Sequence, residues 1–414
     1  MFFCILVATP CLPTPSQADP GDRLAKILAS DGERFDEFSN AIALGTVNST
    51  HIAIITTFRD NDNGMDSGSA YIFDITDPAN PIQLAKFYPD TPSQGDYFGT
   101  GVAIEGTTSI IGDCCTDDAA GAAFLFDISD PSNPTQLAKI TPSDSAAGDQ
   151  FGTSVALLGD IALIGSWLDT NENGFSAGSA YIFNVSDPSN PVELTKLEAD
   201  DGAVSDWFGI SVDLGTVNNS PVAVVGAAAV DAHGVDSGAA YVFAVPSGTQ
   251  LFKLIPNQGT SGNTFGISLG TKGKFVVIGS PGDDTNGPFS GAAYLFDLES
   301  GQQIAQLLAD DGEAGDNFGQ SVALGGSSQT PIALIGAPFD QNDNFPNGSA
   351  YMFTIADPAT PHQVAKLRPD QGFGSDYFGG WVAMDDAIEN PKAIVGAWWD
   401  DDMAPNAGAA YIFD

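Results

Sequence analysis

Oxygen-bearing side chains recur in several short segments at spacings that suit a hard cation. In LDTNENG, Asp169, Asn171 and Asn173 occupy alternate positions ahead of Gly174. Calcium takes about six to eight oxygen ligands, and a glycine permits the sharp turn around the ion. The spacing therefore predicts Ca²⁺ as a cofactor, although Asp and Asn also recur in loops simply as turn residues. The candidate metal ligands are Asp60, Asp62, Asp66, Asp169, Asn171, Asn173, Asp283, Asp284, Asp340, Asn342 and Asp400.

A second chemistry to consider is nucleophilic catalysis by Ser268. In TFGISLG, Gly266, Ser268 and Gly270 have the G-x-S-x-G spacing of a hydrolase nucleophile elbow. That elbow needs a buried strand before the serine, a helix after it, and a His and an acid that converge on it. The assignment depends on whether the serine is singular or belongs to a repeated pattern.

The segment around Ser268 is one copy of a repeat. Each copy holds four short apolar runs bounded by Gly, Asp, Asn and Pro, which are strand signals. Four strands in each of seven copies predict an all-β fold, a seven-bladed β-propeller of four-stranded antiparallel blades. The repeats are anchored, 53 to 60 residues apart, by Phe38, Phe98, Phe151, Phe208, Phe265, Phe318 and Phe378.

The ends of the chain are complementary in this repeat. RLAKIL, at residues 23–28, reads as a fourth strand without a blade, and the terminal AGAAYIFD reads as a third strand with nothing after it. We expect the N-terminal strand to complete the last blade, which closes the ring and removes its exposed edges.

The repeat also accounts for Ser268. Small residues are expected on the innermost strands, which crowd the axis, and the three histidines fall at unrelated repeat positions. We therefore predict no catalytic residue and interpret Trp381 as a plug in the channel. The residues three places after each repeated Phe are Ala41, Gly101, Ser154, Ser211, Ser268, Ser321 and Trp381.

The charge is strongly negative, with 53 Asp and Glu against 13 Lys and Arg and a formal net charge of −40. Such a surface repels phosphates, so nucleic acid is excluded as a partner. In an antiparallel meander, the loops between second and third strands emerge on the same face as the loops between blades. These loops hold 35 of the 53 acidic residues, with only Arg34, Arg59 and Arg368 among them. The alternatives are specific cation sites and a solvated acidic coat.

The first 18 residues resemble a secretory signal, because an apolar run too short to span a bilayer is followed by Ser16-Gln17-Ala18. Residues 19–414 then form a single propeller domain, which we expect to be a monomer, secreted or at the cell surface, or in a periplasm, without membrane insertion after cleavage. The basic start of a signal is missing, so the alternatives are a true start further upstream and an anchored or core-buried segment. Cys114 and Cys115 remain as a reduced pair or a strained vicinal disulfide.

Phe-Gly followed by Gly336-Ala337-Pro338 resembles the FG-GAP repeat of integrin alpha-subunit propellers and of secreted bacterial proteins. The resemblance covers nearly the whole mature chain. Integrin-type repeats carry a D-x-D-x-D-G calcium loop between the first and second strands, and that loop is absent from this sequence. Its ligand chemistry occurs instead between the second and third strands.

The resemblance implies a binding or adhesion module that holds a protein or glycan ligand on the acidic face. The alternative is a propeller enzyme, a hydrolase or lyase, with its site at the central channel. Fold alone does not choose between them. A cluster of acid and base residues outside the repeat pattern would favour the enzyme, and the sequence shows none at the channel mouth.

Overall fold

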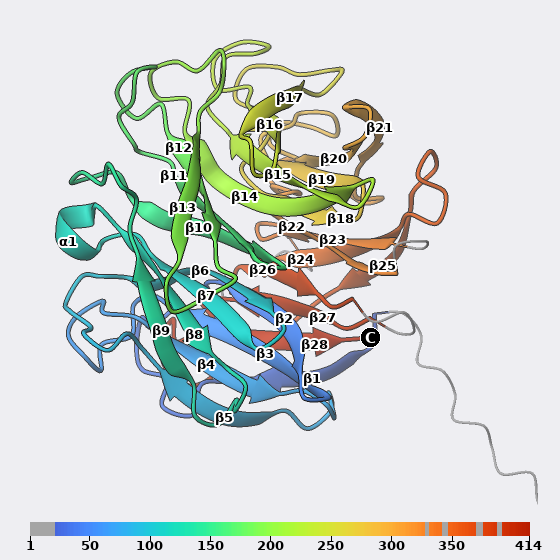
Figure 1. Ribbon diagram of the computed structural model, residues 1–414. Coiled ribbons are helices and arrows are strands. Elements are labelled where there is room, and N and C mark those ends of the chain that lie inside the picture. The colour runs from blue at the N-terminus through green and yellow to red at the C-terminus, as the bar shows by residue number, and fades with distance from the viewer. Residues whose placement is uncertain (1–20, 328–330, 342–346, 370–375, 387–390) are drawn as a thin grey trace, which may run out of the picture.

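The computed structural model describes residues 21–327, 331–341, 347–369, 376–386 and 391–414. Seven four-stranded antiparallel sheets surround a central axis (Figure 1). The predicted all-β, seven-bladed propeller is confirmed. The predicted signal peptide, residues 1–18, lies outside the described residues.

Each of the first six blades is a meander of consecutive strands. Blade 1 contains β2 (Ile42–Val47), β3 (Thr50–Thr57), β4 (Ser69–Asp74) and β5 (Ile82–Phe87). Blade 2 contains β6 (Phe98–Glu105), β7 (Thr108–Asp113), β8 (Ala122–Asp127) and β9 (Thr135–Ile140). Blade 3 contains β10 (Phe151–Leu158), β11 (Ile161–Ser166), β12 (Ser179–Asn184) and β13 (Val192–Leu197).

The second half of the chain repeats the arrangement. Blade 4 contains β14 (Phe208–Val217), β15 (Ser220–Ala227), β16 (Ala239–Ala244) and β17 (Thr249–Leu254). Blade 5 contains β18 (Leu269–Lys272), β19 (Phe275–Ser280), β20 (Ala292–Asp297) and β21 (Gln302–Leu307). Blade 6 contains β22 (Ser321–Gly326), β23 (Pro331–Ala337), β24 (Ser349–Thr354) and β25 (His362–Leu367).

Blade 7 joins the two ends of the chain. It contains β26 (Phe378–Met384), β27 (Ala393–Ala397), β28 (Ala409–Phe413) and β1 (Arg23–Ile27). In Figure 1 the blue β1 lies beside the red β28, and the two strands pair antiparallel with Lys26 opposite Tyr411. The prediction that the N-terminal strand closes the ring is confirmed. Within the described residues the one helix, α1 (Thr116–Ala119), is a single turn with positive φ at Asp117 and Asp118.

The phenylalanine of each repeat fills the core of its blade. Phe38 is fully buried, and its ring meets Tyr71 edge-on at 5.5 Å and Phe73 at 6.0 Å between ring centroids. The same edge-to-face contacts recur in the other blades, and such pairs stabilise a core beyond their buried area. This packing explains why an aromatic residue anchors every repeat.

The glycines of the repeat allow neighbouring blades to approach closely. A Cβ atom on Gly336, in β23, would lie 1.9 Å from the carbonyl oxygen of Gly379 in the next blade. Gly379 itself has φ of +91°, a conformation that L side chains rarely adopt. The Phe-Gly and Gly-Ala-Pro elements are therefore the two sides of one contact between blades.

Candidate functional site

Two kinds of loop form one face of the ring, as the sequence predicts. The β3–β4 loop of blade 1 packs on the loop that leads to blade 2, where Gly95 N–H donates to the Met65 carbonyl and Tyr97 N–H donates to the Asp66 carbonyl. Similar bonds join the corresponding loops of the other blades. We call this surface the acidic face, because its loops hold most of the carboxylates.

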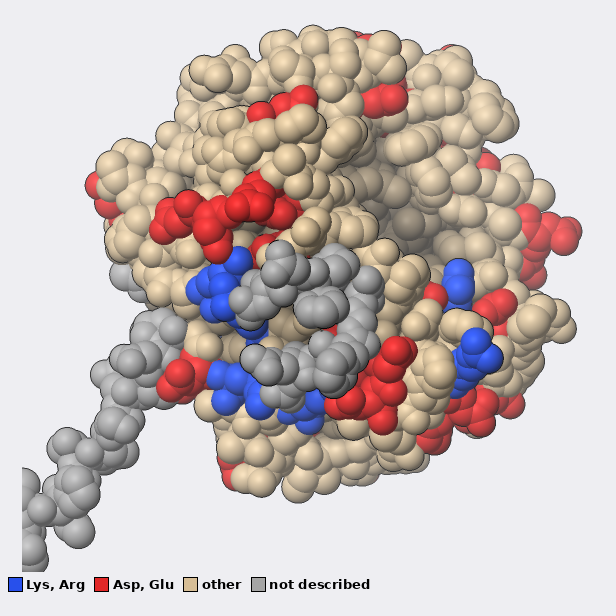
Figure 2. All heavy atoms as spheres, turned by 180° about the vertical axis from the view of Figure 1, so that it is seen from behind, with Lys and Arg blue, Asp and Glu red and all other residues tan. Residues whose placement is uncertain are grey.

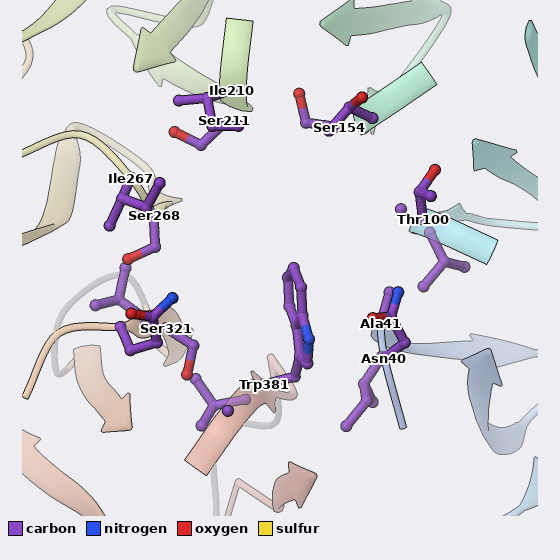
Figure 3. Close-up of a pocket in the computed structure, with 18 of the residues that line it drawn as sticks. Asn40, Ala41, Thr100, Ser154, Ile210, Ser211, Ile267, Ser268, Ser321 and Trp381 are labelled. Atoms are coloured by element: carbon purple, nitrogen blue, oxygen red, sulfur yellow. The ribbon is translucent and has the colours of Figure 1, made fainter. Parts of the chain in front are cut away.

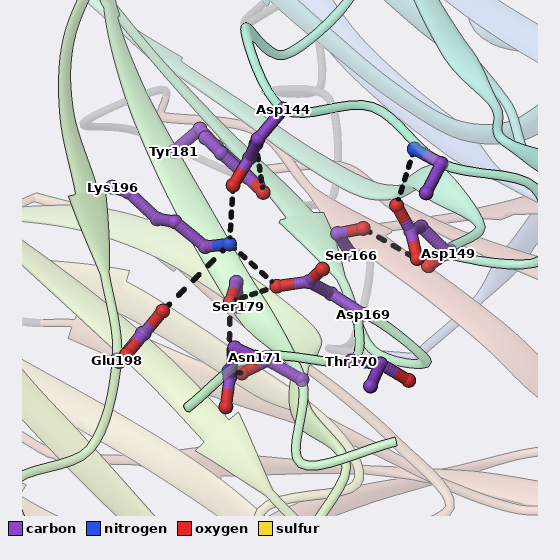
Figure 4. A network of polar contacts seen from close by, with 12 residues as sticks. Asp144, Asp149, Ser166, Asp169, Thr170, Asn171, Ser179, Tyr181, Lys196 and Glu198 are labelled. Carbon is purple, nitrogen blue, oxygen red and sulfur yellow. Dashed lines mark hydrogen bonds and ion pairs between the residues drawn. The ribbon is translucent and has the colours of Figure 1, made fainter. Parts of the chain in front are cut away.

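A buried polar cluster lies under the acidic face in blade 3 (Figure 4). Lys196 on β13 places Nζ 2.6 Å from Asp144 Oδ2 and 2.8 Å from Asp169 Oδ2. Tyr181 on β12 donates its hydroxyl to Asp144, and Ser179 donates to Asp169. We call this arrangement of a fourth-strand lysine, a third-strand tyrosine and loop aspartates the lysine node.

The lysine node recurs around the ring. Fourth-strand lysines reach the acidic face in six blades, in four of them as part of a complete node, so the sequence-based view that only arginines balance the carboxylates there is incomplete. The node is formed by Lys86, Tyr71, Asp31 and Asp60 in blade 1, by Lys366, Tyr351, Asp311 and Asp340 in blade 6, and by Lys26, Tyr411 and Asp400 in blade 7.

Three blades depart from the node in informative ways. In blade 2, Phe124 replaces the tyrosine and Lys139 pairs with the exposed Asp117. In blade 4, the buried Val230 takes the place of the inner aspartate. Blade 5 has Gln306 where the others have lysine, and its amide donates to the Tyr294 hydroxyl.

The nodes perturb the ionisation of their members. Burial acts to raise the pKa of Asp144, yet hydrogen bonds from Lys196 and Tyr181 bring it below its usual value. Burial likewise acts to lower the pKa of Lys196, and its bonds to Asp144 and Asp169 raise it instead. Both partners are therefore held in their charged forms, as expected for a close ion pair that is partly withdrawn from water.

The inner aspartates predicted to bind calcium are buried in these nodes. Asp60, Asp169, Asp340 and Asp400 each have a lysine ammonium within 2.6 to 2.8 Å. Asp283, in blade 5, instead accepts from neutral groups, with Tyr294 at 2.6 Å and Asn263 at 3.2 Å. A cation at these aspartates would have to displace partners that are already in place.

The other predicted ligands form turns. Asn171 accepts from the Asn173 backbone and directs its amide N–H to the Gly178 carbonyl, and Asn173 directs its amide to Ala199. Asp284 accepts from the Phe289 backbone. The two asparagine side chains direct their N–H groups, and not their oxygens, to the carbonyl groups of the protein. These residues therefore do not form a convergent set of oxygen ligands.

Two of the predicted ligands in blade 1 point to different partners. Asp62 is 2.7 Å from Lys86, whereas Asp66 Oδ2 accepts from the Tyr97 hydroxyl at 3.4 Å.

Of the predicted ligands, Asn342 lies outside the described residues. Across the part of the chain that is described, no group of three or more His, Cys, Asp or Glu side chains is arranged to hold a metal ion. The donor set does not fit the oxygen cage that calcium prefers.

In most repeats an aspartate stands two residues before the Phe and caps a turn. Asp149 Oδ2 accepts from the Ala146 backbone N–H at 2.7 Å, and Asp316 Oδ2 accepts from Glu313 at the same distance. Burial raises the pKa of Asp316 to about 6 despite this bond. These residues stabilise the loops between blades.

Ser268 links two neighbouring blades through a hydrogen bond. Its hydroxyl donates to the Gly319 carbonyl at 3.0 Å, just as Ser154 donates to Gly209 and Ser211 to Gly266. No helix follows it, because it sits at the entry to β18. The repeat-based interpretation of Ser268 as a structural residue agrees with this geometry.

The central channel opens into a pocket of about 650 Å³ on the acidic face (Figure 3). Its wall is formed by the start of the first strands, which contribute Ser154, Ser211 and Ser268, and by the rim residues Phe339 and Trp398. Tyr377 is the one ionisable side chain in the described lining. An uncharged pocket therefore opens in the middle of an acidic face.

Trp381 projects from β26 into the middle of this pocket (Figure 3). Its side chain is 38% exposed, whereas the Phe of every repeat is buried. The sequence placed Trp381 at a channel position, and the structure confirms that position. The indole occupies part of the channel and leaves the pocket around it open.

Aromatic side chains also line the rim of the pocket on one side. Tyr377 packs edge-on against Phe339, with 5.0 Å between ring centroids, and against Trp399, with 4.3 Å. Phe58 lines the pocket from blade 1 and contacts Tyr97. This aromatic wall was not predicted from the sequence, although its signal is present there, in the aromatic residues just before several of the repeated Phe residues and just after several of the second strands.

A second cavity, of about 400 Å³, lies at the hairpin ends of the first strands and is lined by His51, Glu105 and Asp386. His51 Nδ1 is 3.3 Å from the Thr46 hydroxyl, and Asp386 pairs with Lys272. Figure 2 shows one face, on which Lys and Arg side chains gather in patches and acidic side chains form separate groups. The negative charge is not spread evenly.

The two cysteines of the described chain are both free. Cys114 and Cys115 lie half-buried in the loop between β7 and β8, and no disulfide joins them. The hydrogen bond between the two thiols moves their pKa values apart. It raises the pKa of Cys114, which burial raises further, and it lowers the pKa of Cys115 against the opposing effect of burial.

Comparison with known proteins identifies the repeat. The family model described as FG-GAP repeat matches residues 22–73, 82–126, 134–183, 191–243, 249–296, 302–353 and 361–413. Each match begins near the fourth strand of one blade and ends in the third strand of the next, which is the phase that the closing strand requires. No curated protein gives a match to the chain. The matched segments cover most of the sequence, and the chain therefore belongs to the FG-GAP repeat family.

Proposed function

We propose that this protein is a secreted or cell-surface binding module that acts in adhesion and holds a protein or carbohydrate ligand at the channel mouth. The FG-GAP propeller fold is consistent with a ligand-binding module, and FG-GAP repeats are typical of extracellular proteins. One observation carries the proposal: the pocket of about 650 Å³ around the exposed Trp381.

The pocket has the physical character of a ligand site. Ligand pockets are concave, about 300 to 1,000 Å³ in volume, and mostly apolar with a few polar groups that orient the ligand. Trp381 is a large aromatic side chain left partly exposed inside a rigid ring of strands. Tryptophans in such positions dominate binding energies at interfaces, because they bury much apolar area on contact.

We treat the protein as a binding module and not as an enzyme. Catalysis by acid and base needs two titratable groups near the reacting atoms. Among the described residues that line the pocket, Tyr377 alone is ionisable. A propeller hydrolase or lyase remains the alternative, to be judged by turnover measurements on the bound ligand.

Secretion is a prediction that accompanies the proposal, whereas calcium binding is not part of it. Across the described residues, the structure contains no helix long and apolar enough to cross a membrane. Calcium is expected from the sequence alone, and the lysine nodes oppose it. Neither is needed for binding at the channel mouth.

The proposal is tested on one array that carries neutral glycans, acidic glycans and basic, acidic and neutral peptides. The array is probed with the full chain, with Trp381→Ser, and with Phe175→Ser as a control. Phe175 is an exposed aromatic side chain, 69% accessible, in the β11–β12 loop of the same face and outside the pocket. Trp381→Ser introduces the residue that four other blades carry at this position, so we expect it to fold.

We expect at least one class of probe to bind the native chain and the Phe175→Ser variant, and to lose at least ten-fold in affinity with Trp381→Ser. Binding that is equal in all three proteins would place the ligand elsewhere and overturn the proposal. Multiple turnover of a bound probe would favour the enzyme.

A further inference from the structure

Blade 7 reverses the order of small and large residues that the other first strands follow. At the second position after Phe, where the other blades carry Asn, Thr, Ile or Gln, blade 7 has Gly380. At the third position, where the others are small, it has Trp381. The indole is seen edge-on in Figure 3, so both of its flat faces look across the channel toward the opposite walls.

The walls that face the indole offer hydrogen-bond acceptors. Four serine hydroxyls each donate a hydrogen bond to a glycine carbonyl of the next blade. They belong to Ser154, Ser211, Ser268 and Ser321. Each oxygen still has acceptor capacity, because a hydroxyl oxygen carries two lone pairs. The side-chain amide of Gln320 lines the pocket and makes no hydrogen bond within the described part of the chain, whereas its backbone N–H donates to the Asn317 carbonyl.

We infer that the pocket binds an uncharged saccharide, with one sugar ring stacked on Trp381 and its hydroxyls donating to the serine oxygens and to Gln320. A sugar ring has a face of C–H groups and an edge of hydroxyls. The face of an aromatic ring is electron-rich and apolar, which suits the C–H face. The serine oxygens suit the hydroxyl edge, since they need donors. This inference rests on the proposed function and names its ligand class.

Charge decides against the competing ligands. The formal net charge of −40 repels uronic acids and sulfated sugars from this face. A primary ammonium or guanidinium would have to leave water for a pocket whose described lining carries no carboxylate, and an unpaired buried charge is costly. A neutral polyhydroxy ring has neither penalty.

The inference is tested with the full chain and a panel of neutral oligosaccharides of glucose, galactose, mannose and N-acetylglucosamine. The same sugars in uronic or sulfated form are the charge controls, and a lysine-rich peptide is the cationic probe. Binding is followed by calorimetry and by tryptophan fluorescence. The variants are Trp381→Ser, Trp381→Phe, Gln320→Ala and the control Phe175→Ser, each compared with the native chain in its melting temperature.

We expect a neutral oligosaccharide to bind at least ten-fold more tightly than its charged counterpart. Trp381→Ser should lose at least ten-fold in affinity at an unchanged melting temperature, Trp381→Phe should keep part of the affinity, and Phe175→Ser should bind normally. If no neutral sugar on the panel binds at millimolar concentration, the saccharide inference is overturned. If the lysine-rich peptide binds in a Trp381-dependent manner, the saccharide inference fails while the proposed function stands. Sugar binding that does not depend on Trp381 overturns both.

Discussion

Lys366 places its ammonium 2.6 Å from Asp340, a carboxylate whose side chain is only 9% exposed. Such a pair costs desolvation when it forms, and it costs far more when one partner is removed, because a buried charge is then left alone. The lysine nodes are therefore sites at which a single substitution has a large and predictable effect.

We predict that Lys366→Met destabilises the protein by about 3 kcal/mol or more, since Asp340 would stay buried without its ammonium partner. Lys253→Met is the matched control. Lys253 lies over Tyr241 as Lys366 lies over Tyr351, but blade 4 lacks the inner aspartate and the partner Asp201 is 53% exposed. An exposed pair contributes about 0 to 1 kcal/mol. Urea unfolding of both variants measures the difference, and equal losses would contradict the role of the buried carboxylate.

The pH dependence of stability should show an unpaired buried acid in blade 2. Asp113 is fully buried at the end of β7. Its Oδ1 accepts from the Cys115 and Thr116 backbone N–H groups, and its Oδ2 has no partner among the residues that the structure describes. Burial, together with the charge of Asp96, raises the pKa of Asp113 from 3.8 to about 7. The unfolded chain releases this proton first, so stability is lost as pH rises from about 4 to about 7.

Asp113→Asn removes this loss. We expect the variant to be more stable than the native protein at pH 8, by on the order of a few kcal/mol, and to gain little at pH 4. Asp311→Asn is the control of opposite sign. Burial acts to raise the pKa of Asp311, but the Lys366 hydrogen bond lowers it, so this variant should lose stability at neutral pH and match the native chain in strong acid. Thermal melts from strong acid to pH 8 measure both trends, and parallel curves for native and Asp113→Asn proteins would refute the assignment.

The fold could be predicted from the sequence because the signals for each blade lie close together within one repeat. Each repeat carries its own strand pattern, its buried Phe and its close-approach glycine, and sevenfold recurrence makes a weak signal specific. The lysine nodes were not predictable in the same way. Lys196 reads as a solvent residue of a short strand, and its partner Asp144 stands 52 positions earlier in the chain. The recurrence of lysine in the fourth strands was visible, but the direction of its side chain was not.

The ring closure leads to a prediction about the N-terminal strand. Removing residues 19–29 deletes β1, and with it the buried Ile27, and exposes the edge of β28 beside Tyr411. We expect this truncation to lower the melting temperature of the whole ring and to promote association through the free edge. Removing residues 1–18 alone keeps β1 and is the control. A truncated ring that melts like the control and stays monomeric would show that closure does not depend on this strand.

The last prediction separates calcium from charge screening on the acidic face. Sodium and calcium both screen repulsion between carboxylates, which decays over about 8 Å at physiological ionic strength. A calcium ion that binds only the folded protein adds about 2.7 kcal/mol at a hundredfold excess over its dissociation constant. The predicted ligands Asp60 and Asp169 already hold lysine ammonium groups at 2.6 and 2.8 Å. We therefore expect calcium and sodium, matched for ionic strength, to raise the melting temperature equally, and chelation to change nothing. A calcium-specific rise that is lost in the double variant Asp169→Ala and Asn171→Ala would contradict this expectation and restore the cation sites that the sequence predicts.

Lys196→Met sharpens the comparison, because it removes the ammonium and leaves both carboxylates. If the lysine is the resident cation of this node, that variant should be destabilised, and calcium should rescue it more than matched sodium does.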